Sequence, residues 1–483
     1  MCRIYNNNNN NNNNMEAIPK AIPSTATDNE RSNRNHILGY QSAVLRSLRA
    51  ANVKFLRYAI LDSFNTVRSK TVPIDHALRI LKRGGDPFAN PVSIAEVCYA
   101  GLPPSADVPV EGAGLTAKNV LALQPDFATL RVLPYSPSTA MVMCTSHDQR
   151  TGELSPLCTR GLLGGVMQRG RDDLGLEFTV GAELEFQLYR LGSDGELRPV
   201  DSSTFANSVT LNEQEEFIAD AYEQIAQQDI NVELIHSESA PGQLEIVLGY
   251  ENALQIADNI FYAKETISSV AKQHGMKALF LPKTSMMTAG NGLHFHYGFR
   301  EVGSTSNAFG DESTPTGISR RGGAFMEGIL QSLPALLSFT LPTNNSFRRV
   351  GPGCWTGSTV SWSTEDKESP LRVCLDLNSG GVSNVELKLS DATANPYLAL
   401  AIVLAAGSEG MRNDLTLRPM NEGGSHDALP ESLTASLGAL RSSHSLLDTL
   451  GRSLSKAYIA VRESEAASEE TLEEEVRNAL MKS

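Results

Sequence analysis

The segment Gly181–Tyr189 (GAELEFQLY) carries two acidic side chains at the spacing of a strand. Side chains alternate between the two faces of a strand, so Glu183 and Glu185 share one face, roughly 7 Å apart. The opposite face holds only apolar side chains: Ala182, Leu184, Phe186 and Leu188. By itself, this pattern is typical of a half-exposed strand with a solvated face. Its significance depends on whether other strands bring similar groups to the same place.

The same alternation of polar and apolar positions recurs in three later segments. Their polar positions are Gln243 and Glu245, then His294 and His296, and finally Asn384, Glu386 and Lys388. If the four strands curve into one sheet or barrel, their polar faces line a common funnel. Carboxylates packed together repel each other unless cations neutralise them. Many oxygens with one or two imidazoles favour Mg²⁺ or Mn²⁺ over zinc.

The sequence around these strands predicts a fold that contains both strands and helices. The strand-like segments are interspersed with helical segments such as Glu251–His274 and Asn395–Gly410. Because the two kinds of element do not alternate strictly, an α+β fold is favoured over a doubly wound one. The chain has 483 residues, of which 41% are apolar, enough for two or three domains with a large core.

Three regions are predicted along the chain. Residues 1–35 contain the run Asn6–Asn14 and are too polar to bury a core, which indicates a disordered tail. Residues 36–150 form a small N-terminal domain that ends in the turn-rich passage Ser146–Pro156. Residues 151–483 form a larger domain that contains all the polar-faced strands.

Composition argues against several classes of function. With 41 basic and 55 acidic residues the net charge is -14, which disfavours binding to nucleic acid. No uncharged apolar run is long enough to span a bilayer, and no leader-like or basic amphipathic segment is evident. The six cysteines are scattered without a CxxC pair. This usage indicates a reducing, cytoplasmic location and no disulfide framework.

Five segments resemble the signature segments of the glutamine synthetase family, in the family's order and spacing. They are Gly181–Phe186 (GAELEF), Glu238–Glu245 (ESAPGQLE), Gly290–His296 (GNGLHFH), Asn345–Gly353 (NSFRRVGPG) and Glu386–Ala401 (ELKLSDATANPYLALA). The resemblance extends roughly from Val53 to Gly410 and points to the class I and fungal synthetase-like branch. It implies a small β-grasp N-terminal domain and a larger catalytic domain with a funnel of antiparallel strands flanked by helices. It also implies a ring-shaped homo-oligomer, a dodecamer or decamer, in which one subunit's N-terminal domain closes its neighbour's funnel.

The resemblance also implies two metal sites. The first would be formed by Glu185, Glu238 and Glu245, and the second by Glu183, His294 and Glu386. These sites would hold two or more Mg²⁺ or Mn²⁺ ions together with ATP. His236 lies two residues before Glu238 but is not counted among the ligands.

Further roles are carried over position by position. His296 matches a position that touches ATP, Gly290 a backbone contact to the amino-acid substrate, and Arg349 a clamp on that substrate's carboxylate. Arg372 matches a contact to the nucleotide phosphates. Asp62 falls where the family keeps an acid that reaches into the neighbouring subunit's site, although Asn65 replaces the family's usual Gly nearby.

Several positions depart from the family pattern on the substrate side. Trp355 stands where the family has a Glu that helps ammonia lose a proton, and branches that join glutamate to larger amines also have Trp there. Lys367 replaces an Arg that contacts phosphate, and Lys388 replaces an Arg on the substrate carboxylate. Asn384 replaces another Arg, and Ala289 replaces an Asn near the substrate. Lys keeps the positive charge but loses the two-pronged geometry of Arg.

The resemblance implies a ligase that works in two steps on small molecules. A substrate carboxylate, glutamate or a similar acid, becomes an acyl phosphate at the expense of ATP, and an amine then displaces the phosphate. Trp355 favours an amine other than ammonium. Three alternatives remain: an ordinary glutamine synthetase using ammonia, a catalytically retired scaffold or signalling protein, and a guanidino-type phosphotransferase of related fold, which the motif order disfavours.

Overall fold

The computed structural model describes residues 30–82, 92–202, 204–351, 354–376, 379–421 and 427–482. Most of the predicted tail, residues 1–29, therefore lies outside the described residues. Helix α1 (Glu30–Ala50) begins before the predicted boundary at residue 35, so residues 30–35 are helical. The boundary shifts because extending an existing helix by a polar turn is much easier than nucleating one.

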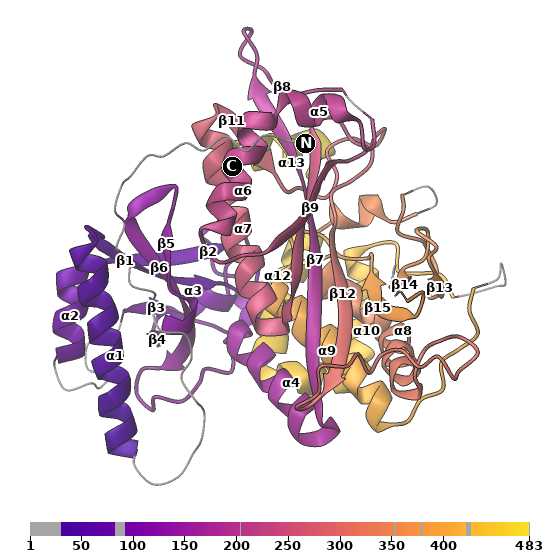
Figure 1. Cartoon of the computed structure of the whole chain (residues 1–483), viewed down its shortest axis with the longest axis horizontal. Helices are drawn as coiled ribbons and strands as arrows, with labels where there is room; N and C mark the ends of the chain where they lie inside the picture. The colour runs from indigo at the N-terminus through magenta and orange to yellow at the C-terminus, as the bar shows by residue number, and fades with distance from the viewer. Residues whose placement is uncertain are drawn as a thin grey trace, which may run out of the picture.

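The first third of the chain builds a six-stranded sheet (Figure 1). Its strands are β1 (Phe55–Leu61), β2 (Val67–Pro73), β3 (Ser93–Ala95), β4 (Val120–Pro125), β5 (Arg131–Leu133) and β6 (Ser136–Asp148). The order is β2-β1-β6-β4-β3, with β5 also paired to β6. Strands β1 and β6 are parallel, and every other pair in this sheet is antiparallel. Its helical elements, besides α1, are α2 (Ile74–Lys82), α3 (Glu96–Ala100), η1 (Glu111–Ala113) and η2 (Phe127–Thr129).

A second sheet of nine strands forms the framework of the larger part. Its strands are β7 (Leu176–Leu191), β8 (Leu197–Pro199), β9 (Val232–Ser237), β10 (Gln243–Asn252), β11 (Met276–Leu279), β12 (Leu293–Glu301), β13 (Trp362–Thr364), β14 (Leu371–Leu375) and β15 (Val382–Leu387). The order is β13-β14-β15-β12-β7-β10-β9, and β8 and β11 extend from β7. All pairs are antiparallel except β13 with β14. The long strand β7 is therefore central, hydrogen-bonded on both sides.

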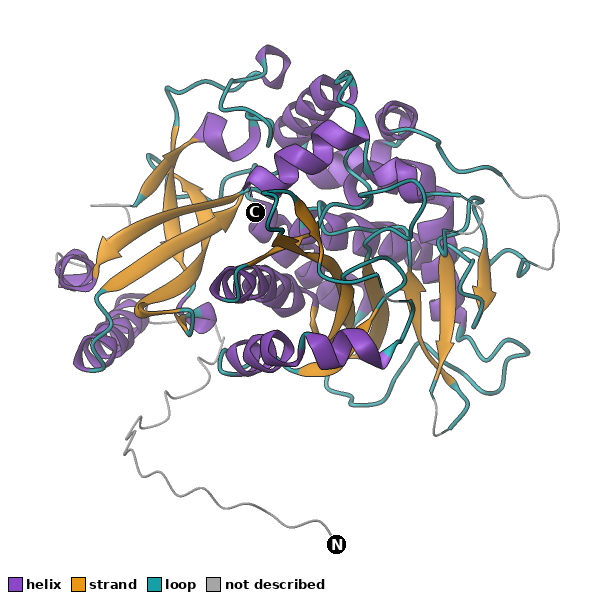
Figure 2. Cartoon of the chain, turned by 90° about the horizontal axis from the view of Figure 1, so that it is seen from above, coloured by secondary structure: helices purple, strands orange, loops and turns teal. Residues whose placement is uncertain are grey.

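Helices cover one face of the large sheet, and the two sheets lie beside one another (Figure 2). The helices are α4 (Thr159–Leu174), α5 (Ser208–Glu213), α6 (Glu215–Ala226), α7 (Ala253–Gln273), α8 (Arg320–Thr340), η3 (Ser346–Arg349), α9 (Pro396–Arg412), α10 (Leu433–Ser442), α11 (His444–Leu450), α12 (Arg452–Ala466) and α13 (Leu472–Lys482). No described helix is long and apolar enough to cross a membrane. The mixture of helices and mainly antiparallel sheets confirms the predicted α+β fold.

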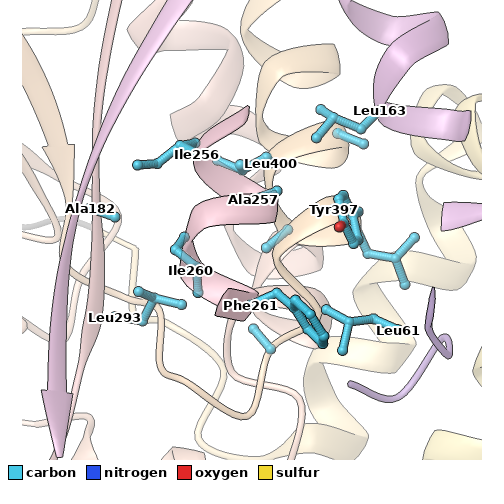
Figure 3. Close-up of a cluster of buried hydrophobic side chains, with 14 of the residues drawn as sticks. Leu61, Leu163, Ala182, Ile256, Ala257, Ile260, Phe261, Leu293, Tyr397 and Leu400 are labelled. Atoms are coloured by element: carbon cyan, nitrogen blue, oxygen red, sulfur yellow. The ribbon is translucent and has the colours of Figure 1, made fainter. Parts of the chain in front are cut away.

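The apolar face predicted for the polar-faced strands packs against these helices. Ala182 on β7 and Leu293 on β12 point toward Ile256 and Ile260 on α7 (Figure 3). All of these side chains are buried. Burying apolar surface contributes about 25 cal/mol per Å², so this face fixes which side of the sheet is turned toward the helices. The opposite face, with the acids and imidazoles, is left to line a cavity.

A buried ion-pair network ties the elements beneath the cavity to the N-terminal sheet. On α4, Arg160 donates from Nε and Nη2 to the two carboxylate oxygens of Asp258 on α7, at 3.0 and 2.9 Å. Its Nη2 also donates to Asp126, which precedes η2, at 2.8 Å. Tyr397 on α9 donates its hydroxyl to Asp258 as well. The Arg160 guanidinium therefore joins three segments that are distant in sequence, and Asp258 adds α9 as a fourth.

We predict that Arg160→Ala lowers the free energy of unfolding by about 3–5 kcal/mol, because it leaves the buried Asp258 carboxylate without its cation. Urea denaturation followed by circular dichroism measures the change. Arg150→Ala is the control, since Arg150 pairs with Asp148 at an exposed position where an ion pair contributes little. An equal effect from the two substitutions would contradict the importance of the buried network.

Candidate active site

The residues predicted to share one funnel lie opposite one another across neighbouring strands. The directly opposed pairs are Glu185 with Glu245, Glu183 with His294, and His296 with Glu386. The row runs without interruption over β10, β7, β12 and β15. Alternation alone puts these side chains on one face, and the register brings them level with one another.

Short contacts link the acids to the imidazoles. Glu183 lies 3.0 Å from His294 Nδ1 through one carboxylate oxygen and 3.0 Å from His296 Nε2 through the other. Among the described residues, three groups offer ligand atoms that lie within 4.8 Å of one another: Glu183, His296 and Glu386; Glu183, Glu245 and His294; and His236, Glu238 and Glu245. Five of the six predicted metal ligands belong to these groups.

Glu185, the sixth predicted ligand, is oriented differently. Its Oε2 accepts hydrogen bonds from the Gly292 backbone N–H at 2.7 Å and from the Gln243 amide at 3.0 Å. Its Oε1 lies 3.8 Å from His294 Nδ1. One oxygen is thus held by the protein, and the other remains directed toward the centre of the site.

Burial and crowding set the protonation of the acids. Burial, together with the nearby Glu238 carboxylate, raises the pKa of Glu185 to about 7. Burial likewise raises the pKa of Glu245 to about 7. Burial also opposes ionisation of Glu183, yet hydrogen bonds from His294 and His296 hold its pKa well below the ordinary value. Buried carboxylates that resist ionisation side by side, with imidazoles between them, are a donor set that fits divalent cations.

The imidazole of His294 is also suited to metal binding. Burial lowers its pKa, and the positive charge of Lys388 lowers it further. A metal-binding imidazole must be neutral, so this environment keeps a lone pair available. The residues of this site would hold Mg²⁺ or Mn²⁺, with the carboxylates supplying most of the ligands.

Cations surround Glu386 at the β14–β15 side of the site. Lys388 Nζ lies 3.0 Å from one carboxylate oxygen, and Arg372 Nε lies 2.5 Å from the other. Burial opposes the charge of Glu386, but Lys388 and His296 hold its pKa below the ordinary value. Glu386 is therefore an anion with two cationic partners in addition to its place among the potential metal ligands.

A cavity of about 820 Å³ opens above this row of side chains. Among the predicted site residues, its walls include Glu183, Glu185, Glu238, Glu245, Gly290, His294, Arg349, Trp355, Lys367, Arg372 and Lys388. His296 and Glu386 are not part of the lining, but they contact Glu183 and Arg372, which are. A volume of this size accommodates small-molecule substrates.

Asp62 is the one predicted site residue that the structure holds apart from the others. It is 1% exposed and follows β1, where its carboxylate accepts from the backbone N–H groups of Phe64 and Thr66, both at 2.9 Å. Arg68 forms an ion pair with it at 3.0 Å. Burial raises its pKa to about 6. Its suggested role in a neighbouring subunit stays a prediction.

The loops that carry Gly290 and Arg349 are fixed by several specific contacts. A Cβ atom at Gly290 would lie 2.5 Å from the Pro282 carbonyl oxygen, so only glycine fits there. The side-chain amide of Asn345 bonds to both backbone groups of Lys283. Its Oδ1 accepts from the Lys283 N–H at 2.6 Å, and its Nδ2 donates to the Lys283 carbonyl oxygen at 2.9 Å. Asn345 also donates to Glu475 on α13 at 2.7 Å. Helix α13 thereby supports the loops that carry Gly290 and Arg349.

Glu475 makes a second contact in the same place, an ion pair with Arg348. The next residue, Arg349, is buried and donates from Nη1 to the Ser390 carbonyl oxygen at 2.8 Å. Its Nη2 lies 3.4 Å from His294 Nε2. The guanidinium of Arg349 is therefore held beside the potential metal ligands with its remaining donors available.

Sequence reasoning left several cavity residues unassigned, among them His236 and Phe205. His236 on β9 lies directly opposite Glu245, and its Nε2 is 3.0 Å from the Glu245 carboxylate. The hydrogen bond to Glu245 raises the pKa of His236 to about 9. Phe205 packs edge-on against His236, with ring centroids 5.9 Å apart. The available signal for His236 was its position just before Glu238 in a strand-like segment, whereas Phe205 lies in a loop without a pattern.

Comparison with known proteins agrees with this geometry. Residues 156–479 match the family described as glutamine synthetase, catalytic domain. The chain belongs to the glutamine synthetase family. Members of the glutamine synthetase family are ligases that form C–N bonds, so the predicted enzyme class is confirmed.

Individual relatives support the assignment to the glutamine synthetase family. The chain is 29% identical over 431 residues to a type-1 glutamine synthetase of Dictyostelium discoideum, covering 85% of each chain. It is 31% identical over 372 residues to a gamma-glutamylpolyamine synthetase of Streptomyces coelicolor, covering 74% of this chain and 79% of that protein. A solved structure of a novel glutamine synthase homolog superposes with a TM-score of 0.77 at 25% identity, covering 89% of this chain and 98% of that one. A GmaS–ADP complex, at 23% identity and a TM-score of 0.75, shares the fold over 87% of this chain and 95% of that one.

We predict that Mn²⁺ stabilises the protein more at pH 8 than at pH 6. The folded-state pKa values of Glu185 and Glu245 are about 7, above their ordinary 4.5. Their contribution to stability is therefore fully present below pH 4.5 and is lost as the pH rises through 7, when the metal-free carboxylates ionise side by side. Mn²⁺ binds the ionised forms and removes this repulsion. Thermal denaturation at equal free Mn²⁺ measures the effect.

Matched substitutions separate this effect from surface charge. Glu245→Gln should reduce the stabilisation by Mn²⁺ at pH 8, whereas Glu463→Gln, which alters a surface pair with Arg441, should not. Equal stabilisation by Mn²⁺ at pH 6 and pH 8 in the unmodified protein would contradict the proposed coupling.

Proposed function

We propose that this protein is an ATP-dependent ligase that joins glutamate, or a similar acid, to an amine other than ammonium. Trp355 at the cavity is the observation that carries this proposal. Its indole is 55% exposed and lines the cavity, at a position where the glutamine synthetase family has a Glu. An indole cannot take a proton from ammonium, but it can serve as an aromatic wall for the carbon chain of a larger amine.

The surroundings of Trp355 support a larger amine. Phe205, also 55% exposed, and Leu234 line the same cavity. The carboxylate of Glu238 lines it too, so the site combines aromatic and apolar surface with negative charge. Aromatic faces and a carboxylate together favour a cationic amine that carries an apolar carbon skeleton. The relative named a gamma-glutamylpolyamine synthetase agrees with such a substrate.

The reaction proceeds in two balanced steps. A carboxylate oxygen of the acid bonds to the γ-phosphorus of ATP while the bond to the β-phosphate oxygen breaks, giving an acyl phosphate and ADP. The neutral amine nitrogen then bonds to the acyl carbon, inorganic phosphate leaves, and the nitrogen loses a proton to the departing phosphate or to water, giving an amide. Divalent cations, when bound, neutralise phosphate charge in this site.

The protein's own cations have separate tasks in this scheme. Arg349 is held beside His294 and can clamp the acid's other carboxylate with its remaining donors. Arg372 and Lys367 line the cavity and would contact the transferred phosphate, with His296 behind them on the nucleotide side. Lys388 is already paired with Glu386 at 3.0 Å, which leaves Arg349 as the principal clamp. Because Lys388 replaces an Arg on the substrate carboxylate, the proposed acid is glutamate or a similar acid.

We also propose that the subunits assemble into a cytoplasmic ring with active sites shared between neighbours. Near Gly290, Met286 is 63% exposed and Met287 is 91% exposed. Large apolar side chains exposed side by side are typical of a surface that another chain covers. Their position supports a subunit contact beside the substrate end.

Phosphate release with glutamate, ATP and a panel of amines tests the proposed function. We expect ammonium to be a poorer nucleophile than amines that carry an alkyl chain. Trp355→Glu should lower kcat/KM for the best amine by about fivefold or more, the equivalent of about 1 kcal/mol of cation–π contact, and should improve the relative use of ammonium.

Trp355→Phe is the matched control, because it keeps an aromatic face and should retain most of the preference. Ammonium as the best nucleophile would support an ordinary glutamine synthetase instead. ATP binding without phosphate release for every acid and amine would support a catalytically retired scaffold.

A further inference from the structure

His236 lies beside the first predicted metal site but has no role in the family resemblance. Strand β9 places it directly across from Glu245 on β10. Its Nε2 is 3.0 Å from a carboxylate oxygen of Glu245, and its Nδ1 is 3.7 Å from a carboxylate oxygen of Glu238. The side chain lines the same cavity as both acids. Its position is therefore defined by two residues that are themselves predicted metal ligands.

The other ring nitrogen of His236 is engaged by the backbone. Nδ1 lies 3.0 Å from the Ser237 carbonyl oxygen, which only accepts hydrogen bonds, so Nδ1 carries a proton. In the metal-free protein Nε2 shares a proton with the Glu245 carboxylate, and a divalent cation that displaces this proton would take its place on Nε2. Metal-binding histidines characteristically donate their second N–H to a backbone carbonyl or a carboxylate, which fixes the tautomer and the ring orientation.

We propose that His236 Nε2 binds the same divalent cation as Glu238 and Glu245, as a ligand beyond the three carboxylates that the resemblance assigns. One atom from each of these three residues lies within 4.8 Å of the others. Ligands of an octahedral ion with bonds of about 2.1 Å are separated by roughly 3–4.2 Å, so modest side-chain adjustments suffice.

The orientation of Glu185 supports His236 as an additional metal ligand. Glu185 Oε2 accepts from Gly292 and Gln243, which leaves only its Oε1 for a metal ion. A site with fewer free carboxylate oxygens has a place for a further donor. His236 lies at the opposite side of Glu245 from Glu185, in the same row across β9, β10 and β7. The proposed set therefore surrounds the ion from both sides of Glu245.

An imidazole ligand predicts a particular metal preference. Mg²⁺ strongly favours oxygen ligands, whereas Mn²⁺ has a higher affinity for sites that include an imidazole. This site should therefore select Mn²⁺ over Mg²⁺ more strongly than three carboxylates would. The inference concerns the metal site alone and does not depend on which amine is used.

Calorimetric titration of the full-length, nucleotide-free protein with Mn²⁺ and then with Mg²⁺ tests this inference. His236→Asn keeps a polar group near the Nδ1 position but removes Nε2. We expect it to weaken Mn²⁺ binding at one site by about tenfold or more, with a clearly smaller effect on Mg²⁺. His236→Gln places an amide oxygen near the lost Nε2 and should restore part of the Mn²⁺ affinity.

His274→Asn is the matched control, because His274 also contacts an acid, Asp220, at 2.8 Å, but far from the cavity lining. Pulsed electron paramagnetic resonance of bound Mn²⁺ gives an independent readout: nitrogen coupling should lose amplitude in His236→Asn and not in His274→Asn. Unchanged affinities, or equal losses for Mn²⁺ and Mg²⁺ with unchanged nitrogen coupling, would overturn the proposal. If His236→Asn fails to fold, the Mn²⁺ and Mg²⁺ affinities of His236→Gln are compared with those of the unmodified protein. An unchanged ratio of the two affinities would overturn the proposal.

Discussion

The register of β7 with its two neighbours is the constraint on which the site depends. Glu185 must lie opposite Glu245 on one side, while Glu183 must lie opposite His294 on the other. A slip of one residue would turn the carboxylates toward α7 and the apolar side chains toward the cavity. Each misplaced carboxylate would then be buried without a partner, at a cost of several kcal/mol. Alternation along one strand therefore specifies the pairing of several.

The same constraint explains why the acids can be held so close together. Their repulsion acts on one face of the sheet, whereas the apolar face of the same strands is fixed on the helices by Ala182, Leu293 and their neighbours. Burial of that apolar face supplies the free energy that keeps the carboxylates together when no cation is bound. Folding and metal binding thus act on opposite faces of the same strands.

Much of this could be predicted from sequence because alternation and spacing are local. The strands with Glu183, Glu245, His294 and Glu386 are found where the pattern placed them, with their apolar sides buried.

Glu238 lies just beyond β9, where no periodicity exists, so only the family resemblance could indicate it. Residues 30–35 were assigned to the tail because they are polar and carry no apolar stripe, yet they are helical as part of α1. Long-range pairing was also invisible, because nothing local shows that His236 faces Glu245. The domain boundaries and the individual site roles stay predictions.

Helix α13 has a consequence for the order in which the site matures. Its Glu475 supplies the counter-charge for Arg348 and a hydrogen bond to Asn345, although it follows them by 127 and 130 positions in the chain. The strands that bear the acids and imidazoles are complete long before α13 is synthesised. During synthesis the metal-binding face can therefore form first, while the loops around Gly290 and Arg349 wait for the last helix. The contacts of Glu475 with Arg348 and Asn345 can therefore form only after nearly the whole chain has been made.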